Sequence, residues 1–248
     1  MSKGCPRWVP SIDELSMGPA AMTTLEGART TLPGPWRAVC FDLDGLLVDT
    51  EPMWMDAKEE LFTRLGLAFD VADQAAVFGA SEVQAAAYFT RRMGLPESET
   101  ETERVRVEYL ELVRTRLEER EIPIRPGARE MLTSLRGRVP VALVTNTRRS
   151  LVDVVLQRAG LAGLFDAIAT SDETEPKPAP HLYLLACARL GVETTSAVGL
   201  EDSPTGVRAV KAAGLHCICV PSTPDSDVSQ ADEIIGSVLD LLDADTDR

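Results

Sequence analysis

Two aspartates separated by one residue stand at the end of a short apolar run. Asp42 and Asp44 follow the run Ala38–Phe41 and precede Gly45, which allows a tight turn. Carboxylates at the end of a buried strand are costly unless they are paired, bind a metal or act in catalysis. Strand side chains two residues apart project the same way, with bases roughly 6–7 Å apart. That spacing has room for a phosphoryl group between a nucleophile and a proton donor, although a simpler interpretation has both aspartates only capping a turn.

A second carboxylate pair closes another apolar run. Glu201 and Asp202 follow Ala197–Leu200, so they should stand at the carboxyl end of a second strand. Ligands of open α/β sheets bind at that edge. Hard oxygen ligands from two strand ends are typical of a Mg²⁺ site that leaves positions for water and phosphate. The alternative is that this segment N-caps the next helix, which Ser203 can do while Asp202 binds the metal.

Two weaker elements complete the pattern. Thr145 and Asn146 follow the run Val139–Val144, where a hydroxyl and a backbone N–H can donate to phosphate oxygens, or simply cap a helix. Lys177 stands between two prolines in a chain that has four lysines among its 25 basic residues. A compact ammonium on a stiff loop there would neutralise both Asp42 and a phosphate, whereas by itself it would be an ordinary surface lysine.

The elements that position these residues follow from short apolar, β-branched runs. Such near-continuous runs are typical of parallel strands buried on both faces. Helical patterns separate most of them, so we expect an α/β fold with a doubly wound parallel sheet. The runs are Ala38–Phe41, Val139–Val144, Ala167–Ala169, Ala197–Leu200 and Cys217–Val220.

The long gap between the first two runs is largely helical in pattern. Thr50 can N-cap a first helix, with Pro52 tolerated in its first turn. Ser81 and Gln84 form a capping box for a second helix that should run to about Met93. A third helix carries an apolar stripe opposite Glu and Arg. We therefore predict an all-helical cap domain inserted after the first strand, able to act as a lid.

These features divide the chain into three parts. Residues 1–35 are rich in proline and glycine and are expected to be a loosely ordered extension. Residues 36–49 and 126–248 should form the α/β core, and residues 50–125 the helical cap domain. Hinges are expected near residues 48–50 and 122–126.

Composition excludes several classes of protein. The 248 residues carry a formal net charge of −14, which argues against a general nucleic-acid-binding surface. No apolar run approaches the roughly eighteen residues that span a membrane. The start of the chain lacks the order of a secretory signal, and the five cysteines are dispersed. We therefore expect a cytoplasmic protein that acts on a small molecule, as a monomer or a weak dimer.

Taken together and in this chain order, the four elements resemble those of the haloacid dehalogenase-like (HAD) phosphohydrolases, in particular the β-phosphoglucomutase-like branch. The resemblance covers roughly residues 36–240. It implies that Asp42 is the nucleophile that forms an aspartyl-phosphate and that Asp44 is the general acid/base. Thr145 and Lys177 match the phosphate-binding hydroxyl and ammonium. Asp42, Glu201 and Asp202, with the Asp44 backbone carbonyl, match the Mg²⁺ site; direct or water-mediated binding by Glu201 is left open.

The choice among the reactions of this family depends on the predicted cap. The mutases carry a histidine four residues after the position of Thr50, and basic residues around the glycine that matches Gly79. This chain has Trp54, Phe78 and Glu82 in those places, which would hold the second phosphate of a bisphosphate poorly. These three residues and Thr50 are candidate specificity residues. Hydrolysis is therefore favoured over a β-phosphoglucomutase-like reaction.

Three further comparisons narrow the reaction. The segment 51–54 resembles small sugar-phosphate and hexitol-phosphate phosphatases, and 45–50 also resembles pseudouridine 5′-phosphatases. Schiff-base cleavage of phosphonates needs a cap lysine, and Lys58, the one lysine of the insertion, lies among charged residues. A non-catalytic ligand-binding protein predicts loss of an essential residue, and none is lost. The expected function is a Mg²⁺-dependent phosphatase for a sugar, polyol or nucleoside monophosphate.

Overall fold

The predicted parallel sheet is present in the computed structural model, which describes residues 29–30, 32, 34–77, 80–224 and 226–243. Six strands pair in parallel in the order β4-β3-β2-β5-β6-β7. This is the doubly wound α/β fold predicted from the sequence. The strands are β2 Ala38–Phe41, β3 Val141–Thr145, β4 Ala167–Thr170, β5 Ala197–Glu201, β6 His216–Cys219 and β7 Glu233–Ile234.

The sheet order brings three functionally important strand ends together. β2 lies between β3 and β5, with Phe41 level with Leu143 on one side and Leu200 on the other. The residues that follow these strands therefore emerge at one edge of the sheet. Five of the six strands match the predicted apolar runs. β7 was not predicted, because two residues are too few to show a period.

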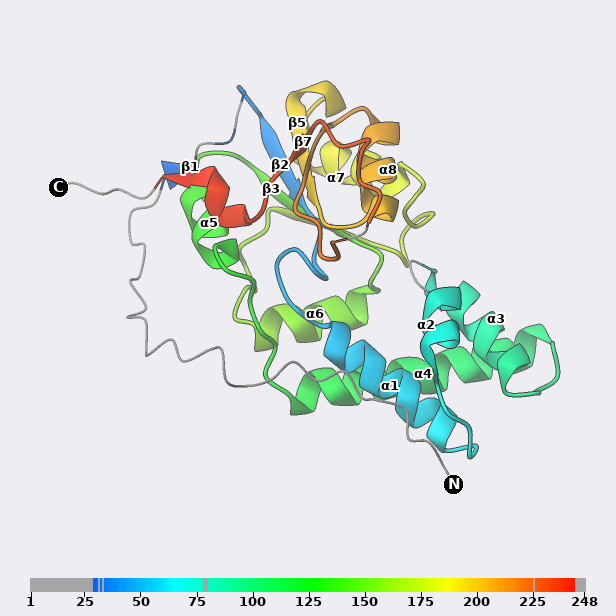
Figure 1. The fold of residues 1–248 in the computed structure, drawn as a ribbon. Coiled ribbons are helices and arrows are strands. Elements are labelled where there is room, and N and C mark those ends of the chain that lie inside the picture. Colours follow the sequence, from blue (N-terminus) through cyan, green and yellow to red (C-terminus); the bar gives the residue numbers. More distant parts are fainter. Residues whose placement is uncertain (1–28, 31, 33, 78–79, 225, 244–248) are drawn as a thin grey trace.

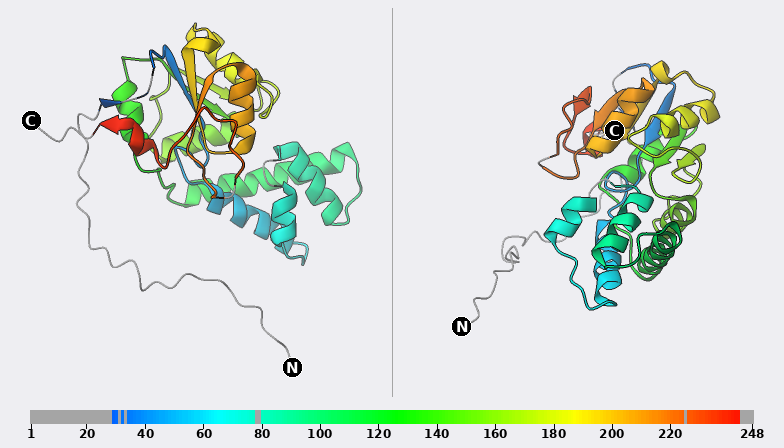
Figure 2. Two further views of the ribbon diagram at one scale, coloured as in Figure 1. Left: turned by 45° about the horizontal axis from the view of Figure 1, so that its top comes forward. Right: turned by 90° about the vertical axis from the view of Figure 1, so that its right-hand side faces the viewer.

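Helices cover both faces of the sheet (Figures 1 and 2). The apolar side chains of α5 and α6 pack with one set of strand residues, which includes Val39 and Phe41. Those of α7 and α8 pack with the alternate set, which includes Ala38 and Cys40. This alternation follows from the period of two in a strand. The bounds are α5 Ala128–Leu135, α6 Arg149–Arg158, α7 His181–Leu190 and α8 Pro204–Ala213.

Of the five helices that the described chain has between β2 and β3, the first four, α1 to α4, extend away from the sheet (Figure 1). The capping box of Ser81 and Gln84 is present as predicted. α2 was not predicted; the Asp70 side chain accepts hydrogen bonds from the backbone N–H groups of its first turn. The bounds are α1 Glu51–Thr63, α2 Val71–Val77, α3 Glu82–Arg92 and α4 Glu99–Glu119.

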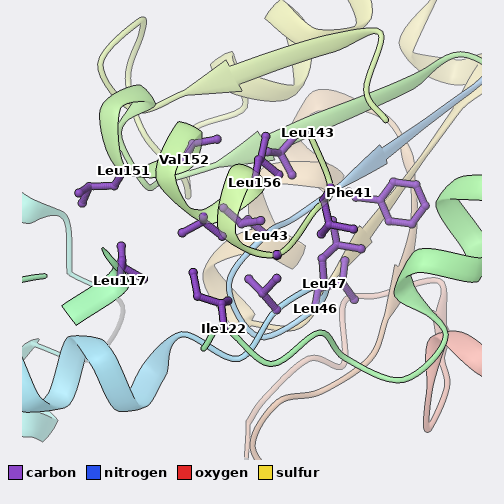
Figure 3. Packing of buried hydrophobic residues seen from close by; sticks show 14 of the residues in the cluster. Phe41, Leu43, Leu46, Leu47, Leu117, Ile122, Leu143, Leu151, Val152 and Leu156 are labelled. Atoms are coloured by element: carbon purple, nitrogen blue, oxygen red, sulfur yellow. The ribbon is translucent and has the colours of Figure 1, made fainter. Parts of the chain in front are cut away.

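Apolar side chains form a continuous cluster from the sheet into this helical insertion. Leu117 of α4 and Ile122 lie beside Leu151 of α6 in Figure 3, and all three belong to the same buried cluster as Phe41. α4 and α6 are in direct contact. The C-terminal end of α4, where the insertion returns to the core, therefore packs on the core helix α6.

The chain ends of the described region pair with each other. β1, Arg29–Thr30, runs antiparallel to β8, Leu242–Asp243, which follows the 3₁₀ helix η3 at Val238–Leu241. This short sheet differs from the loosely ordered chain expected through residue 35. The rest of that predicted extension, residues 1–28, 31 and 33, lies outside the described residues. Within the described part of the chain, no helix has the length and apolarity needed to cross a membrane.

Candidate active site

The turn after β2 places the two aspartates beside the second carboxylate pair. Asp42 extends the strand, and its N–H donates to the Leu200 carbonyl at 3.0 Å. Gly45 has φ of 93°, a conformation that favours glycine. A Cβ at this position would stand 2.1 Å from Asp202 Oδ2. Glycine is therefore required here both for the turn and for the close approach of Asp202.

Lys177 is the centre of the charge network. Its buried Nζ donates to Asp42 Oδ1 at 2.6 Å, to Glu201 Oε1 at 2.5 Å and to the Val144 carbonyl at 2.7 Å. Burial lowers the pKa of Lys177, but the charges of Asp42 and Glu201 outweigh burial and hold that pKa above its ordinary value. The ammonium therefore stays charged, with all three of its N–H groups engaged.

Asn146 positions the loop that carries Lys177. Its amide nitrogen donates to the Lys177 carbonyl at 3.1 Å, and its amide oxygen accepts from the Lys177 N–H at 2.8 Å. The sequence suggested that Asn146 binds phosphate. In the structure, both polar ends of its side chain bind the backbone of Lys177, so this side chain acts on the site through Lys177.

Asp44 is surrounded by threonine hydroxyls. Thr147 Oγ1 donates to Asp44 Oδ2 at 2.7 Å, and Thr50 Oγ1 donates to Oδ1. Thr145 Oγ1 lies 3.4 Å from Oδ2 and also accepts from the Thr147 N–H. Thr50 occupies the N-cap position of α1, as expected, but its hydroxyl makes no capping hydrogen bond. Its hydroxyl is used by Asp44 instead.

Three carboxylates stand close enough to share a cation. Asp42, Glu201 and Asp202 offer oxygen atoms within 4.8 Å of one another, and all three residues are buried. Burial raises the pKa of Asp202 to about 7, and the charge of Glu201 adds to this effect. Burial likewise raises the pKa of Asp42. Lys177 is the ammonium in contact with the group, so an excess of negative charge remains that suits a divalent cation.

Glu201 has further partners that the sequence did not indicate. The Tyr183 hydroxyl donates to Glu201 Oε1 at 2.6 Å. Burial, and then the charge of Glu201, raise the pKa of Tyr183, so it remains a neutral donor. The start of α8 lies against the same carboxylate, because a Cβ on Gly206 would stand 1.8 Å from Glu201 Oε2. Ser203 caps this helix as predicted, accepting from the Gly206 N–H at 3.1 Å.

Two connected cavities open from these residues. The larger, about 740 Å³, is lined by Asp42, Asp44, Lys177 and Asp202 and by further charged side chains that include Arg125 and Arg208. The smaller, about 220 Å³, extends from Asp44 into the helical insertion. Both share the wall made by Glu51, Gln74, Ala80, Asn146 and Thr147.

The candidate specificity residues have different positions. Trp54 lines the smaller cavity, with its ring 5.9 Å from that of Tyr109. Glu82 lines it too, and forms ion pairs with Arg106 at 3.3 Å and Arg148 at 3.2 Å. Phe78 lies outside the described residues.

Sequence reasoning missed several residues of this site. Thr147 and Tyr183 hold Asp44 and Glu201, and Arg148 pairs with Glu82. Lys58 and Gln74 line the smaller cavity. Lys58 carried one usable signal, because it is one of only four lysines. Thr147 carried another, because it directly follows Thr145 and Asn146 at the end of an apolar run. The others carried none, because Tyr, Arg and Gln are common near helix starts and on helix surfaces.

Comparisons with known proteins agree with this geometry. The model of the haloacid dehalogenase-like hydrolases matches residues 36–214. (DL)-glycerol-3-phosphatase 2 of Arabidopsis thaliana is 31% identical, over 90% of this chain and 93% of that protein. Fructose-1-phosphate phosphatase YqaB of Escherichia coli (strain K12) is 30% identical, over 75% of this chain and 96% of the length of that phosphatase. The crystal structure of CbbY from Rhodobacter sphaeroides in complex with phosphate has a TM-score of 0.74 and 30% identity, covering 83% of this chain and 96% of that one.

Proposed function

Because the chain belongs to the haloacid dehalogenase-like hydrolases and is a phosphoric monoester hydrolase, we propose that it releases phosphate from a small sugar, polyol or nucleoside monophosphate with the help of Mg²⁺. The observation that carries this proposal is the buried ammonium of Lys177 between Asp42 and Glu201, at the wall of a cavity that also contains Asp44. This set of groups can bind a phosphate, attack it and supply a proton.

The first displacement takes place at Asp42. One oxygen of its carboxylate attacks phosphorus, and the bond from phosphorus to the ester oxygen breaks, leaving an aspartyl-phosphate on Asp42. Lys177 holds Oδ1 at 2.6 Å and so fixes the direction of attack. Its positive charge also offsets the repulsion between the carboxylate and the phosphate dianion.

Asp44 moves the proton in both displacements. In its acid form it gives a proton to the leaving oxygen, so the alcohol departs neutral. As a carboxylate it then accepts a proton from a water molecule whose oxygen attacks phosphorus, which releases inorganic phosphate and restores Asp42. The hydroxyls of Thr50 and Thr147 hold Asp44 in place between these steps.

Asp42, Asp202, Glu201 and the Asp44 backbone carbonyl are the groups that would hold the metal. The donor set contains only oxygen, which is what Mg²⁺ prefers. When bound, Mg²⁺ would offset negative charge on the phosphoryl oxygens. Glu201 also accepts from Lys177 and Tyr183, so it fixes the ammonium whether or not it touches the metal.

We also propose that residues 50–125 form a cap domain over the site. Trp54, Glu82 and Tyr109 of this segment line the smaller cavity next to Asp44. A substrate whose phosphate lies at Lys177 would place its alcohol part against these helices. The predicted monomeric state and cytoplasmic location stay expectations from the sequence.

A screen of phosphate monoesters tests the function. Sugar, polyol and nucleoside monophosphates and p-nitrophenyl phosphate are offered with Mg²⁺ and with a chelator, and released phosphate is measured. We expect activity only with the metal. Full activity in Asp42→Asn, or none in the wild type with any ester, would contradict the proposal.

A β-phosphoglucomutase-like reaction is the alternative. It requires the cap side of the cavity to bind a second phosphate, yet Glu51 and Glu82 line that side, with Lys58 as the basic residue among its described lining. β-Glucose 1-phosphate with a bisphosphate primer should therefore yield free phosphate and no glucose 6-phosphate.

A further inference from the structure

A buried lysine lines the cap side of the smaller cavity and has no part in the chemistry proposed above. Lys58 lies on α1, one helical turn beyond Trp54, and its side chain is 10% exposed. Its ammonium donates to Gln74 Oε1 of α2 at 3.1 Å and stands 3.5 Å from Glu51 Oε1. Gln74 in turn donates to Glu51 at 3.3 Å. We call Glu51, Lys58 and Gln74 the polar triangle.

The hydrogen bonds of Lys58 are incomplete. An ammonium has three N–H groups, and among the described residues it has two acceptors, one of them at the limit of hydrogen-bond distance. A buried charge with a missing partner is costly, so a ligand that supplies an acceptor gains binding energy there. All three members of the triangle line the smaller cavity. The missing acceptor can therefore come from a bound molecule.

The surrounding charges indicate what kind of acceptor fits. Lys58 is the one basic residue in the described lining of the smaller cavity, whereas Asp44, Glu51 and Glu82 are acidic. Two arginines already pair with Glu82, so a second anionic group on the substrate would meet the carboxylates of Asp44 and Glu51 and is disfavoured there. A hydroxyl suits the triangle better, because it accepts from the ammonium and donates to the carboxylate of Glu51.

The other walls indicate the shape of the ligand. Trp54 and Tyr109 present aromatic surface to the smaller cavity, which suits the C–H side of a carbohydrate chain or ring. The cavity of about 220 Å³ is equivalent to roughly seven water molecules. That volume fits a leaving group of a few carbons.

We propose that the polar triangle selects the leaving group, and that Lys58 determines specificity for a neutral, polyhydroxylated alcohol of a few carbons. This inference rests on the proposed phosphatase function, because the phosphate must lie at Lys177 for the alcohol to reach Lys58. It assigns Lys58 a role in substrate binding.

The test compares three kinds of leaving group. Glycerol 3-phosphate has a neutral polyol, 2-phosphoglycolate an anionic group, and p-nitrophenyl phosphate an aromatic group without hydroxyls. kcat and KM are measured for the wild type and for Lys58→Met, which keeps the length of the side chain. We expect kcat/KM for glycerol 3-phosphate to fall about 10- to 100-fold, mainly through KM, as expected for one charge-assisted hydrogen bond. For p-nitrophenyl phosphate the fall should be at least tenfold smaller.

Two variants complete the design. Lys211→Met is the matched control, because Lys211 forms an exposed ion pair with Asp232 outside both cavities. It should leave kcat and KM unchanged for all three substrates. Glu51→Gln removes the carboxylate from the triangle. It should lower kcat/KM for glycerol 3-phosphate and raise kcat/KM for 2-phosphoglycolate several-fold. If Lys58→Met does not fold, Glu51→Gln decides the question through its changes in kcat/KM for glycerol 3-phosphate and for 2-phosphoglycolate.

The outcomes separate this inference from the proposed function. Wild-type protein that is inactive on every ester overturns the phosphatase itself. The second case is an active wild type together with a Lys58→Met variant whose kcat/KM falls equally for all three substrates, or falls most for 2-phosphoglycolate. Either result overturns only the role of Lys58. The same holds if the wild type hydrolyses p-nitrophenyl phosphate but not glycerol 3-phosphate.

Discussion

At the scale of single residues, Lys177 joins two carboxylates that have different tasks. Its ammonium contacts Asp42, the proposed nucleophile, and Glu201, which has no exposed surface. A buried carboxylate without this partner would be strongly destabilising. Lys177 is thus needed by the fold as well as by the proposed chemistry, and substitutions at Lys177 cannot separate the two.

The substitution Asp42→Asn separates the contribution to the fold from the contribution to the proposed chemistry better. Burial raises the pKa of Asp42, so its charged form destabilises the metal-free fold at neutral pH. The amide has the same shape without the charge. We expect Asp42→Asn to raise the melting temperature of the metal-free protein while kcat falls by at least about 10³-fold. Calorimetry and a phosphatase assay check this, and a lower melting temperature would contradict it.

The carboxyl group of Asp202 links metal binding to pH. Its pKa is raised to about 7 in the folded protein, whereas the unfolded chain loses this proton near pH 4. Folded protein then holds more protons between these values, so the stability of the metal-free protein should fall as pH rises from about 4 to 7.

The same linkage makes a prediction for Mg²⁺. Because the metal binds the carboxylate and not the acid, the rise in melting temperature on adding Mg²⁺ should be larger at pH 8 than at pH 6. Differential scanning fluorimetry at fixed metal concentration measures it. Asp202→Asn should lose this pH dependence, and an equal rise at both pH values in the wild type would count against the metal site.

At the scale of elements, an ion pair joins the helical insertion to the core. Glu82 stands in the first turn of α3, and Arg148 is the N-cap residue of α6. Their side chains lie 3.2 Å apart and are largely buried. Glu82 was expected to contact substrate, and its contact with Arg148 gives it a second role in holding the helical insertion against the core.

Arg148→Met should weaken that contact. We expect KM to rise about three- to tenfold with a smaller change in kcat, because the closed arrangement that completes the cavity is less populated. Arg149→Met is a matched control, since Arg149 pairs with Asp153 on its own exposed helix face. Identical kinetics in the two variants would rule out the role given to Arg148.

Asp73 holds α2 against α3. Its buried carboxylate accepts from the Tyr88 hydroxyl at 2.6 Å and from Arg92 at 2.8 Å. Burial raises the pKa of Asp73, but these hydrogen bonds and the Arg92 charge outweigh burial and lower it overall. α2 also carries Gln74, so this contact supports the wall of the smaller cavity.

Asp73→Asn should therefore cost about 1–2 kcal/mol of the free energy of unfolding at pH 7. Because the folded pKa is lowered, the contribution is present above about pH 4 and is lost as the pH falls through the folded pKa. Urea titrations of both proteins at pH 7 and pH 3.5 measure the difference. If the difference in free energy of unfolding between the wild type and Asp73→Asn is the same at both pH values, this assignment is contradicted.

At the scale of the whole molecule, the apolar cluster is shared between the insertion and the core (Figure 3). A cap that moves as a lid is often pictured as independent of its core. Here Leu117 and Leu151 bury surface between α4 and α6. Any motion of the cap must therefore keep this contact, and opening is expected at the α3 end, where Glu82 meets Arg148.

Shared packing predicts a single unfolding transition. Leu117→Ala should lower the free energy of unfolding by about 2–4 kcal/mol and keep one transition, because it weakens both parts together. Leu65→Ala, at a half-exposed position of the same insertion, should have a much smaller effect. Two separate transitions in the wild type, followed by calorimetry, would show that the parts unfold independently.

The sequence by itself determined the fold class, the family and the type of reaction. The run Ala38–Phe41 has the same bounds as β2, and the capping box at Ser81 begins α3. These signals are local, because strand burial, strand ends and helix caps depend on a few neighbouring residues. The parallel topology then requires the strand ends that carry Asp42 and Glu201 to meet at one edge.

Only the tertiary structure decided which side chains share a partner. Asn146 binds the Lys177 backbone, and Lys58 meets Gln74 from another helix. Glu82 pairs with an arginine of the core. These contacts join residues far apart in sequence, and they depend on how helices pack rather than on any local period. The proposed chemistry at Asp42 and Asp44 was therefore readable from the chain, whereas the groups that choose its substrate became visible only in the folded molecule.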